Sequence, residues 1–402
     1  MLTVKQIAYE KLGIPSQNKV ILSLDGGGIK GILTLQLLKK LEEIAGAPCY
    51  AWCDMVAGTS TGGIIAGLIL KKHSALQIEQ YYIQLVSQVF TKRGLLANRF
   101  LNPPAFDKKN YRNLLKTIVG DATLEEACRE SGLDFLITSK DMWAGEETFF
   151  TCFENGGIKG TYKEALLRYV MEATMSAPTY FQPMERFIDG GTTTLNNPVG
   201  AAMLEALTYS GKGKYHSDQL TLFSFGTSTC LRFVDIQDSS NPKGLDAYFW
   251  LNYVMDESSK DASEMQVDVL RSGLIPGLDF RRYQISMDKI ALSKIPDKDI
   301  SQLPHTPAAT LRELTDEELS KIDLADVSKF DLMKTIGEAM AEHICPSEEQ
   351  SLPAEQRKAN WFKKDLLAPN STRGELVTAF GDTDAIASQL KSPQWLDTQR
   401  SA

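Results

Sequence analysis

The sequence predicts an α/β protein whose mostly parallel central sheet carries helices on both faces. Three observations lead to this fold class. Short apolar segments of strand length alternate with segments of helical period through the first half of the chain. Glycine-rich turns follow three of the strand-like segments. The composition, 43% hydrophobic and 23% charged, is that of a globular chain with a sizeable core. Alternating strands and helices build βαβ units, and their parallel sheets are covered on both sides.

The expected elements follow one another in a regular order. Residues 19–24 (KVILSL) are short and apolar, which is typical of a buried strand. Residues 32–44 place leucines at helical spacing on one face and form the first expected helix. Further strands are expected over residues 53–58, 133–141, 147–153, 186–189 and 220–228, and further helices over 62–72, over 162–175 and from Pro198, a residue favoured at helix starts.

The pattern changes in the C-terminal part of the chain. Residues 313–344 read as a strongly amphipathic helical region, with Thr315 and Glu318 spaced as a capping box. We therefore expect a catalytic α/β domain over residues 1–275, with a motif-bearing core over 19–229. Residues 276–402 are expected to form a helical extension and tail packed on the same domain.

Charge and cysteine content narrow the function classes. The net charge of −8 argues against a protein that binds nucleic acid polymers, which need clustered Lys and Arg. No apolar run approaches the roughly 18–20 residues needed to span a bilayer, and the N-terminus does not resemble a signal peptide. The six cysteines are scattered, so buried free thiols and a cytoplasmic location are expected. No His or Cys set completes a zinc site, and no metal is expected.

The first glycine-rich segment, DGGGIKG over residues 25–31, allows two interpretations. Its glycines match G-x-G-x-x-G, the dinucleotide-binding pattern, and acidic Glu42, Glu43 and Asp54 follow in the region of a ribose partner. Alternatively, the backbone amides of Gly26, Gly27 and Gly28 form an oxyanion hole for a negative charge that develops during a reaction. No P-loop pattern occurs in the chain.

The second segment, GTSTGG over residues 58–63, matches the nucleophile-elbow pattern G-x-S-x-G. In this pattern the serine, here Ser60, stands on a sharp strand-to-helix turn. Gly58 and Gly62 allow the two neighbouring elements to approach closely. The apolar residues on both sides supply the strand–turn–helix context that the pattern requires, so we predict Ser60 as a nucleophile.

The third segment places Asp189 at the end of a short strand, directly before Gly190 and Gly191. Alone it reads as an Asp-Gly turn. Together with the other two segments it predicts a carboxylate base at the sheet edge that carries Ser60. The alternative is a Ser–Asp–His triad that uses one of three histidines, but none lies in an informative setting: His216, His305 and His343.

DGGGIKG, GTSTGG and DGG, in this order, resemble the motifs of bacterial-type patatin-like phospholipases, and Asn196 to Pro198 add to the likeness. The resemblance spans residues 22–198, a little under half of the chain. It implies a three-layer α/β/α sandwich and a catalytic Ser60–Asp189 dyad. It also implies an oxyanion hole at Gly26, Gly27 and Gly28. The dinucleotide interpretation explains neither the elbow nor the Asp189 turn.

The resemblance implies a lipid acyl hydrolase that cleaves acyl esters of membrane phospholipids or galactolipids. It implies no cofactor, no metal and only transient contact with a membrane surface. Two alternatives stay open. One is a hydrolase gated by a small-molecule or protein activator, of which antiviral effectors controlled by cyclic nucleotides are a known form. The other is a non-catalytic module that keeps the fold. The oligomeric state and the roles of Asp25 and Lys30 are not predicted, and Gly31 supports the motif.

Overall fold

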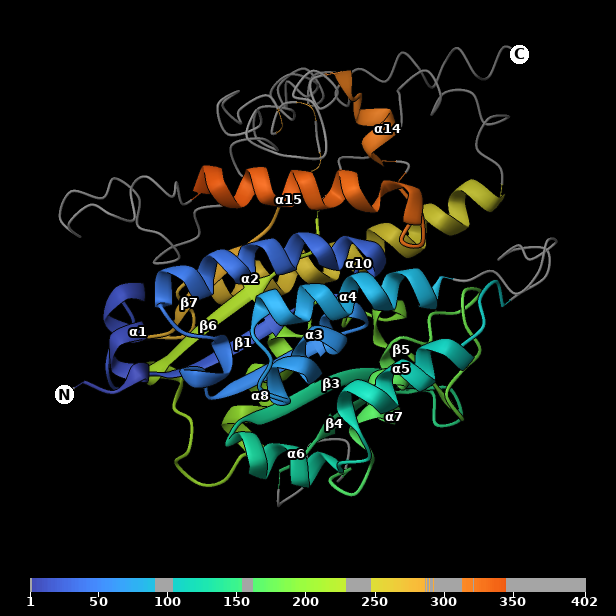
Figure 1. Cartoon of the computed structure of the whole chain (residues 1–402). Coiled ribbons are helices and arrows are strands. Elements are labelled where there is room, and N and C mark those ends of the chain that lie inside the picture. The colour runs from blue at the N-terminus through green and yellow to red at the C-terminus, as the bar shows by residue number, and fades with distance from the viewer. Residues whose placement is uncertain are drawn as a thin grey trace, which may run out of the picture.

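The structure is a computed structural model. It describes residues 2–90, 104–153, 162–228, 247–285, 287, 289, 292, 313–320 and 322–344. Within these residues the chain builds one twisted sheet with helices packed on both of its faces (Figure 1). The predicted fold class is thus confirmed.

The sheet has seven strands, and most of its pairs are parallel. The strands are β1 (Lys19–Leu24), β2 (Met55–Thr59), β3 (Asp134–Asp141), β4 (Glu146–Thr151), β5 (Phe187–Asp189), β6 (Leu220–Phe225) and β7 (Asp279–Tyr283). Their order is β4-β3-β2-β1-β6-β7, with β5 also paired to β3. Among the described strands, only the pairs β3–β4 and β3–β5 are antiparallel. The carboxyl ends of β1, β2, β3, β6 and β7 consequently lie at one edge of the sheet.

Helices cover the sheet on two sides. They are α1 (Val4–Leu12), α2 (Gly31–Ala45), α3 (Thr61–Leu70), α4 (Ala75–Val89), α5 (Lys109–Val119), α6 (Leu124–Ser131), α7 (Leu167–Thr174), α8 (Val199–Tyr209), α10 (Ala247–Arg271), α14 (Asp316–Ser320) and α15 (Phe330–Ile344). The side chains of β1 alternate between two apolar clusters, as expected for a strand buried on both faces. Leu22 and Leu24 pack in the cluster with α2 and α15, whereas Ile21 packs in the cluster with α8.

The C-terminal part differs from the sequence expectation in two ways. Strand β7 lies beyond residue 275, so the expected helical extension also contributes a strand to the sheet. The expected helix over 313–344 is two helices, α14 and α15, separated by a turn. The turn forms because Asp323 and Asp326 accept bonds from the backbone N–H groups of Ala325 and Ser328, which competes with helical bonding. The predicted capping box is present, with Thr315 Oγ1 accepting from the N–H of Glu318.

Two further boundaries are also shifted. Helix α7 begins at Leu167, later than the expected start at residue 162. Pro198 occupies the N-cap of α8, one position before the first helical residue where it was expected. Because Pro198 lacks an N–H, it leaves no donor unpaired at either position.

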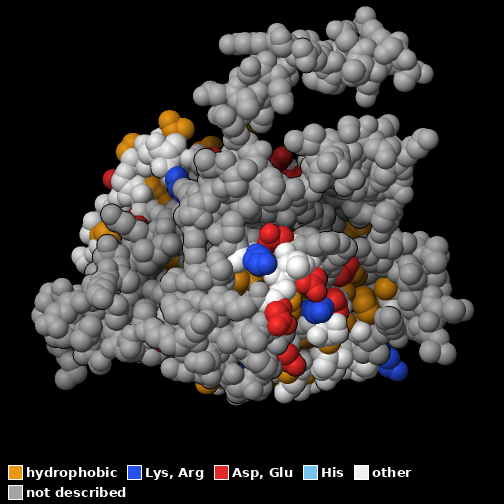
Figure 2. All heavy atoms as spheres, turned by 90° about the horizontal axis from the view of Figure 1, so that it is seen from above, with side chains coloured by type: hydrophobic (Ala, Val, Ile, Leu, Met, Phe, Trp, Pro, Cys, Tyr) orange, Lys and Arg blue, Asp and Glu red, His pale blue; other side chains and the backbone are white. Residues whose placement is uncertain are grey.

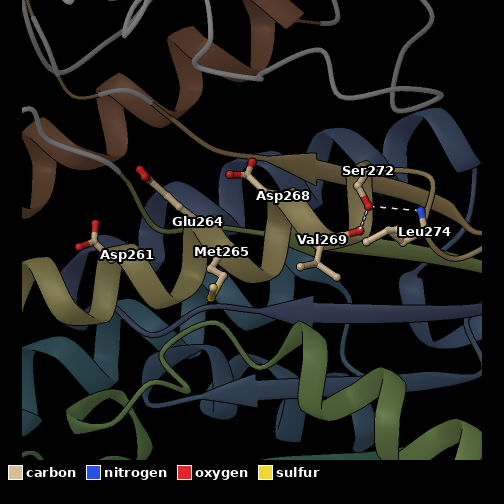
Figure 3. Close-up of a pocket in the computed structure, with 7 residues that line it drawn as sticks. All are labelled: Asp261, Glu264, Met265, Asp268, Val269, Ser272 and Leu274. Atoms are coloured by element: carbon tan, nitrogen blue, oxygen red, sulfur yellow. Dashed lines mark hydrogen bonds between the residues drawn. The ribbon is translucent and has the colours of Figure 1, made fainter. Parts of the chain in front are cut away.

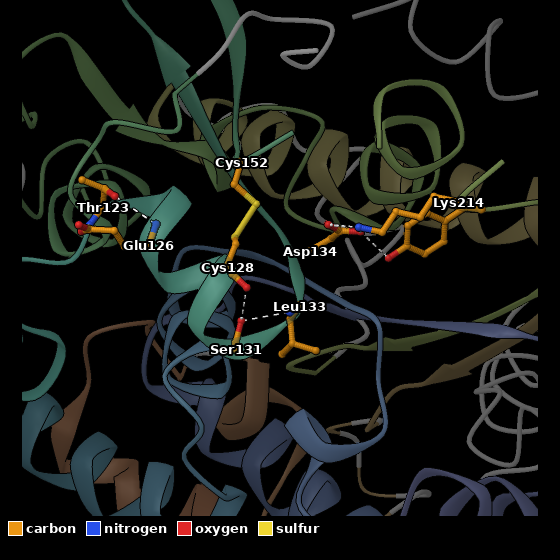
Figure 4. Close-up of a disulfide and its surroundings, with 9 residues drawn as sticks. Thr123, Glu126, Cys128, Ser131, Leu133, Asp134, Cys152 and Lys214 are labelled. Atoms are coloured by element: carbon orange, nitrogen blue, oxygen red, sulfur yellow. Dashed lines mark hydrogen bonds and ion pairs between the residues drawn. A yellow bond between two sulfur atoms is a disulfide. The ribbon is translucent and has the colours of Figure 1, made fainter. Parts of the chain in front are cut away.

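The cysteines correct one expectation. Cys49 and Cys53 are buried free thiols, as predicted, and burial raises the pKa of both. Cys128 on α6 and Cys152 after β4, however, are joined in a disulfide (Figure 4). Their 24-residue separation spans β3 and β4, so scattered positions in the sequence did not reveal the pair. Cys230 and Cys345 lie outside the described residues.

Where described residues are visible in the view from above, acidic and basic side chains lie close together (Figure 2). Among the described helices, none is long and apolar enough to cross a membrane.

Candidate active site

Ser60 stands on the sharp turn between β2 and α3. Its backbone angles, φ 53° and ψ −125°, are strained for a residue with a side chain. The flanking glycines are required by close contacts. A Cβ at Gly58 would lie 2.3 Å from the carbonyl oxygen of Gly62, and a Cβ at Gly62 would lie 2.2 Å from that of Leu24. The predicted elbow is therefore present, and it holds the Ser60 side chain apart from the sheet and the helix.

One edge of β3 brings the serine and the aspartate together. β2 pairs with β3 up to Thr59 opposite Thr138. β2 then ends, and β5 takes its place with Asp189 opposite Ser139. Ser60 directly follows Thr59, so residues about 130 positions apart in the sequence reach neighbouring places on the sheet edge. The Ser60 hydroxyl donates a 2.6 Å hydrogen bond to Oδ2 of Asp189.

Asp189 is buried and held by two donors. The Gly191 N–H donates to Oδ1 at 2.7 Å, while Ser60 bonds to the other oxygen. Burial raises the pKa of Asp189 to about 7, because desolvation disfavours the carboxylate more than these two bonds favour it. A carboxylate with a pKa close to neutral is well matched to proton transfer. Gly190 allows close packing here, because its Cβ would lie 2.4 Å from Thr138 Oγ1.

The histidines do not join this pair in the described part of the chain. Neither Ser60 nor Asp189 has a hydrogen bond to a histidine there. His216 is exposed, and the ring of His73 packs on Tyr81. His305 and the side chain of His343 lie outside the described residues. Among the described residues, Asp189 is the titratable side chain that bonds to Ser60.

The hydrogen bonds of the glycine loop single out two backbone amides. The Asp25 N–H donates to Phe225 O, the Gly26 N–H to Asn196 O, and the Ile29 N–H to Leu324 O. In the described structure the N–H groups of Gly27 and Gly28 have no partner. Gly26 was expected to supply an oxyanion donor, but its N–H already binds the chain segment that follows the DGG turn. Gly27 and Gly28 remain as candidate donors.

The loop has no room for side chains at these glycines. A Cβ at Gly27 would lie 2.2 Å from Thr227 Oγ1. Gly28 has a φ of +57°, and its Cβ would lie 2.2 Å from the Leu324 carbonyl oxygen. Gly26 approaches Ser60 itself, since its Cβ would be 3.1 Å from that of the serine. The loop is thus packed directly beside the nucleophile elbow.

The two unassigned residues of the loop have different surroundings. Asp25 is buried and forms a two-point ion pair with Arg282 of β7, in which Nη1 lies 2.9 Å from Oδ1. Lys30 is half-buried and makes no ion pair with a described residue. Gly31 opens α2 beneath Tyr82, whose hydroxyl would lie 2.5 Å from a Cβ at this position. The role of Arg282 was not predicted from the sequence. Two consecutive arginines in a strand were a signal for it, because successive side chains face opposite sides of a sheet and each arginine would need a partner on its own side.

An apolar pocket lies next to Ser60. It is lined by Thr61, Ile64, Tyr82, Leu85, Val86, Val89, Phe90, Tyr111 and Met175. One of its lining residues contacts the serine, since Met175 Sδ is 3.8 Å from Ser60 Oγ. Its volume of about 10 Å³ is roughly that of one water molecule. The larger concave surface, about 470 Å³, lies along the outer side of α10 and contains neither Ser60 nor Asp189 (Figure 3).

A buried serine hydroxyl bonded to a carboxylate, beside two backbone amides without a described partner, provides the groups that nucleophilic attack on a carbonyl requires. Residues 22–203 match the family model described as patatin-like phospholipase. This part of the chain, a little under half of it, is thus similar to patatin-like phospholipase domains.

Relatives come from several kingdoms. The mouse 85/88 kDa calcium-independent phospholipase A2 is 30% identical over 55% of this chain and 29% of its own length. The cUMP-AMP-activated phospholipase of Escherichia coli is 30% identical over 46% of this chain and 58% of its own length. The chain thus spans less than two thirds of these relatives. Among solved structures, VipD from Legionella pneumophila covers 81% of this chain and 68% of its own, with 11% identity and a TM-score of 0.36.

A Gly62→Ala substitution should disturb the elbow. The new methyl group meets the backbone carbonyl of Leu24, which cannot move without shifting β1. We expect a loss of about 1–3 kcal/mol in the free energy of unfolding, and slow labelling of Ser60 by a fluorophosphonate.

Gly67→Ala is the matched control on the same helix. Its methyl group meets the side chain of Met171, which is flexible and can adjust. This variant should label at close to the wild-type rate. If Ser60 is labelled at the same rate in both variants, the close contact between Gly62 and Leu24 does not affect the reactivity of Ser60.

Proposed function

We propose that the protein hydrolyses fatty acyl esters of membrane lipids, with Ser60 as nucleophile and Asp189 as base. The observation that carries the proposal is the 2.6 Å hydrogen bond from the Ser60 hydroxyl to a buried carboxylate whose pKa lies near 7. The match to patatin-like phospholipases supports the lipid class of the substrate.

The chemistry follows from these positions. Ser60 Oγ bonds to the ester carbonyl carbon while its proton passes to Asp189. The carbonyl oxygen becomes negative and accepts hydrogen bonds from Gly27 and Gly28, each worth up to about 3–4 kcal/mol to the transition state. The intermediate then expels the alcohol, which takes the proton from Asp189, and an acyl-serine remains. Asp189 next accepts a proton from water, whose oxygen bonds to the acyl carbon. The bond between that carbon and Ser60 Oγ then breaks, Asp189 returns the proton to Ser60 Oγ, and the fatty acid leaves.

The site suits an apolar acyl chain. The pocket beside Ser60 is lined largely by aliphatic and aromatic side chains, among them Leu85, Phe90 and Met175. Phospholipids or galactolipids present such chains at a membrane surface, so the proposal includes transient contact with a membrane. The pocket holds about one water molecule as it stands, so its lining side chains must move apart to admit an acyl chain.

An activator is a second candidate feature of this function. A relative that shares 30% identity over 201 residues is named a cUMP-AMP-activated phospholipase. The closed pocket beside Ser60 fits a resting state that requires a signal to open. If so, cUMP-AMP should raise phospholipid hydrolysis by the purified protein at least about tenfold, as for typical ligand-coupled equilibria. Full activity without any addition would contradict gating.

Ser60→Ala and Asp189→Asn should each remove lipid hydrolysis. Losses of at least about 10³-fold are expected, because each variant lacks one member of a unit that acts together. Fatty acid release from phosphatidylcholine vesicles measures the effect. His216→Ala is the control, since that residue is exposed, and it should keep full activity. Loss of activity in the His216 variant would favour a triad instead.

Activity should depend on the ionisation of Asp189. Only the carboxylate accepts the serine proton, so the rate should be constant above pH 8 and fall below about pH 7. The decline should approach tenfold per pH unit, measured with a soluble ester such as p-nitrophenyl butyrate. A profile that stays flat down to pH 5 would exclude Asp189 as the base.

The same raised pKa predicts the stability of Asp189→Asn. The folded protein keeps the Asp189 proton up to about pH 7, whereas the unfolded chain loses it near its ordinary value of 3.8. The folded state therefore binds more protons between these values, and its stability falls as pH rises through this range. Asp189→Asn has no titrating group at this position, so its stability does not fall in this way. The melting temperature of the variant minus that of the wild type should increase between pH 5 and pH 8. A difference that does not change with pH would contradict the raised pKa of Asp189.

A further inference from the structure

Arg282 reaches the glycine loop from outside the segment that matches the family. It lies on β7, and its register partner on β6 is Ser224. The guanidinium passes across β6 to Asp25, which directly follows β1. Nη1 donates to Asp25 Oδ1 at 2.9 Å and to Ser224 Oγ at 2.7 Å, and Nη2 donates to the second carboxylate oxygen. Arg282 is 5% exposed and Asp25 is 4% exposed.

The contribution of the buried ion pair between Arg282 and Asp25 to fold stability does not by itself account for the pair, because burying both charges has a high desolvation cost. Removing two charges from water costs several kcal/mol per ion, and apolar replacements of buried pairs are often neutral or stabilising. The gain here is geometric. A planar fork that grips both oxygens of one carboxylate fixes its position and its rotation. Asp25 stands two residues before Gly27, so the ion pair fixes the start of the loop that carries the two amides. Thr227 holds the next peptide, because its Oγ1 donates to Gly26 O at 2.7 Å.

We propose that Arg282 is a positioning residue that orients the amides of Gly27 and Gly28 through its ion pair with Asp25. The inference rests on the proposed function, because it assigns those amides to the oxyanion. It also means that the C-terminal part of the chain completes the site, since β7 lies outside residues 22–203. The other end of the loop is held from the same part, where Leu324 accepts from the Ile29 N–H at 2.8 Å.

The neighbouring Arg281 provides a matched comparison. It is equally buried, at 2% exposed, and it also pairs with a carboxylate, that of Asp279. Successive strand residues face opposite sides, and Arg281 instead donates to the carbonyl oxygens of Leu12 and Gly13, at the end of α1 and outside the glycine loop. A purely structural role for buried arginines on β7 would affect both positions alike.

The test replaces the ion pair by apolar residues of similar size, in the double variant Asp25→Leu/Arg282→Met. Steady-state hydrolysis of p-nitrophenyl butyrate gives kcat and KM across pH, and a thermal melt reports folding. We expect kcat to fall about tenfold or more, because small misplacement of a reacting group has large effects. KM should stay within about twofold, and the acid limb near pH 7 should not move, because Asp189 is untouched.

Two further variants keep the test decisive if the double variant does not fold. Arg282→Lys keeps the charge but cannot grip both oxygens, and its kcat should fall about fivefold or more. Arg281→Met should keep kcat within about twofold of the wild type. If the double variant or the Arg282→Lys variant is folded and has a kcat near that of the wild type, the positioning role of Arg282 is overturned, while the proposed function still stands. A wild type that neither hydrolyses the ester nor labels at Ser60 with a fluorophosphonate would overturn the proposed function and the inference with it.

Discussion

The site depends on the place where β3 changes partner. Up to Thr138 its edge pairs with β2, and from Ser139 the same edge pairs with β5 in the opposite direction. The two strands therefore end against each other, and each delivers one reactive side chain to the junction. The 2.6 Å bond between Ser60 and Asp189 is the consequence. Burial at this junction also raises the pKa of Asp189 to about 7, so one structural constraint sets both the geometry and the acidity of the base.

The glycine loop is the complementary half of the site. Its amides at Asp25, Gly26 and Ile29 are occupied by bonds to three distant segments, and those of Gly27 and Gly28 are left without a described partner. The elements that occupy the first three come from β6, from the turn after Asp189 and from the C-terminal part of the chain. The loop is therefore shaped by tertiary contacts as well as by its own glycines. This explains why a pattern that also fits nucleotide binding can serve another chemistry.

Local patterns predicted much of this. The boundaries of β1 and the elbow at Ser60 could be inferred because strand length, apolar runs and close glycine contacts are local properties. β7 could not be inferred, because its sequence DFRRY contains two arginines and does not resemble a buried strand. Both arginines are buried because they bond to residues near the N-terminus, Arg281 to Leu12 and Arg282 to Asp25. The occupation of the Gly26 amide by Asn196 and the Cys128–Cys152 disulfide were equally invisible, because both join segments that only the fold brings together.

If Ser60 is the nucleophile, it carries the acyl group during turnover. This is tested by quenching the protein in acid while it hydrolyses phosphatidylcholine and mapping the acylated peptide by mass spectrometry. We expect one fatty acyl mass on the peptide that contains Ser60. Hydrolysis that proceeds without an acylated peptide, or with the acyl group on another residue, would contradict it.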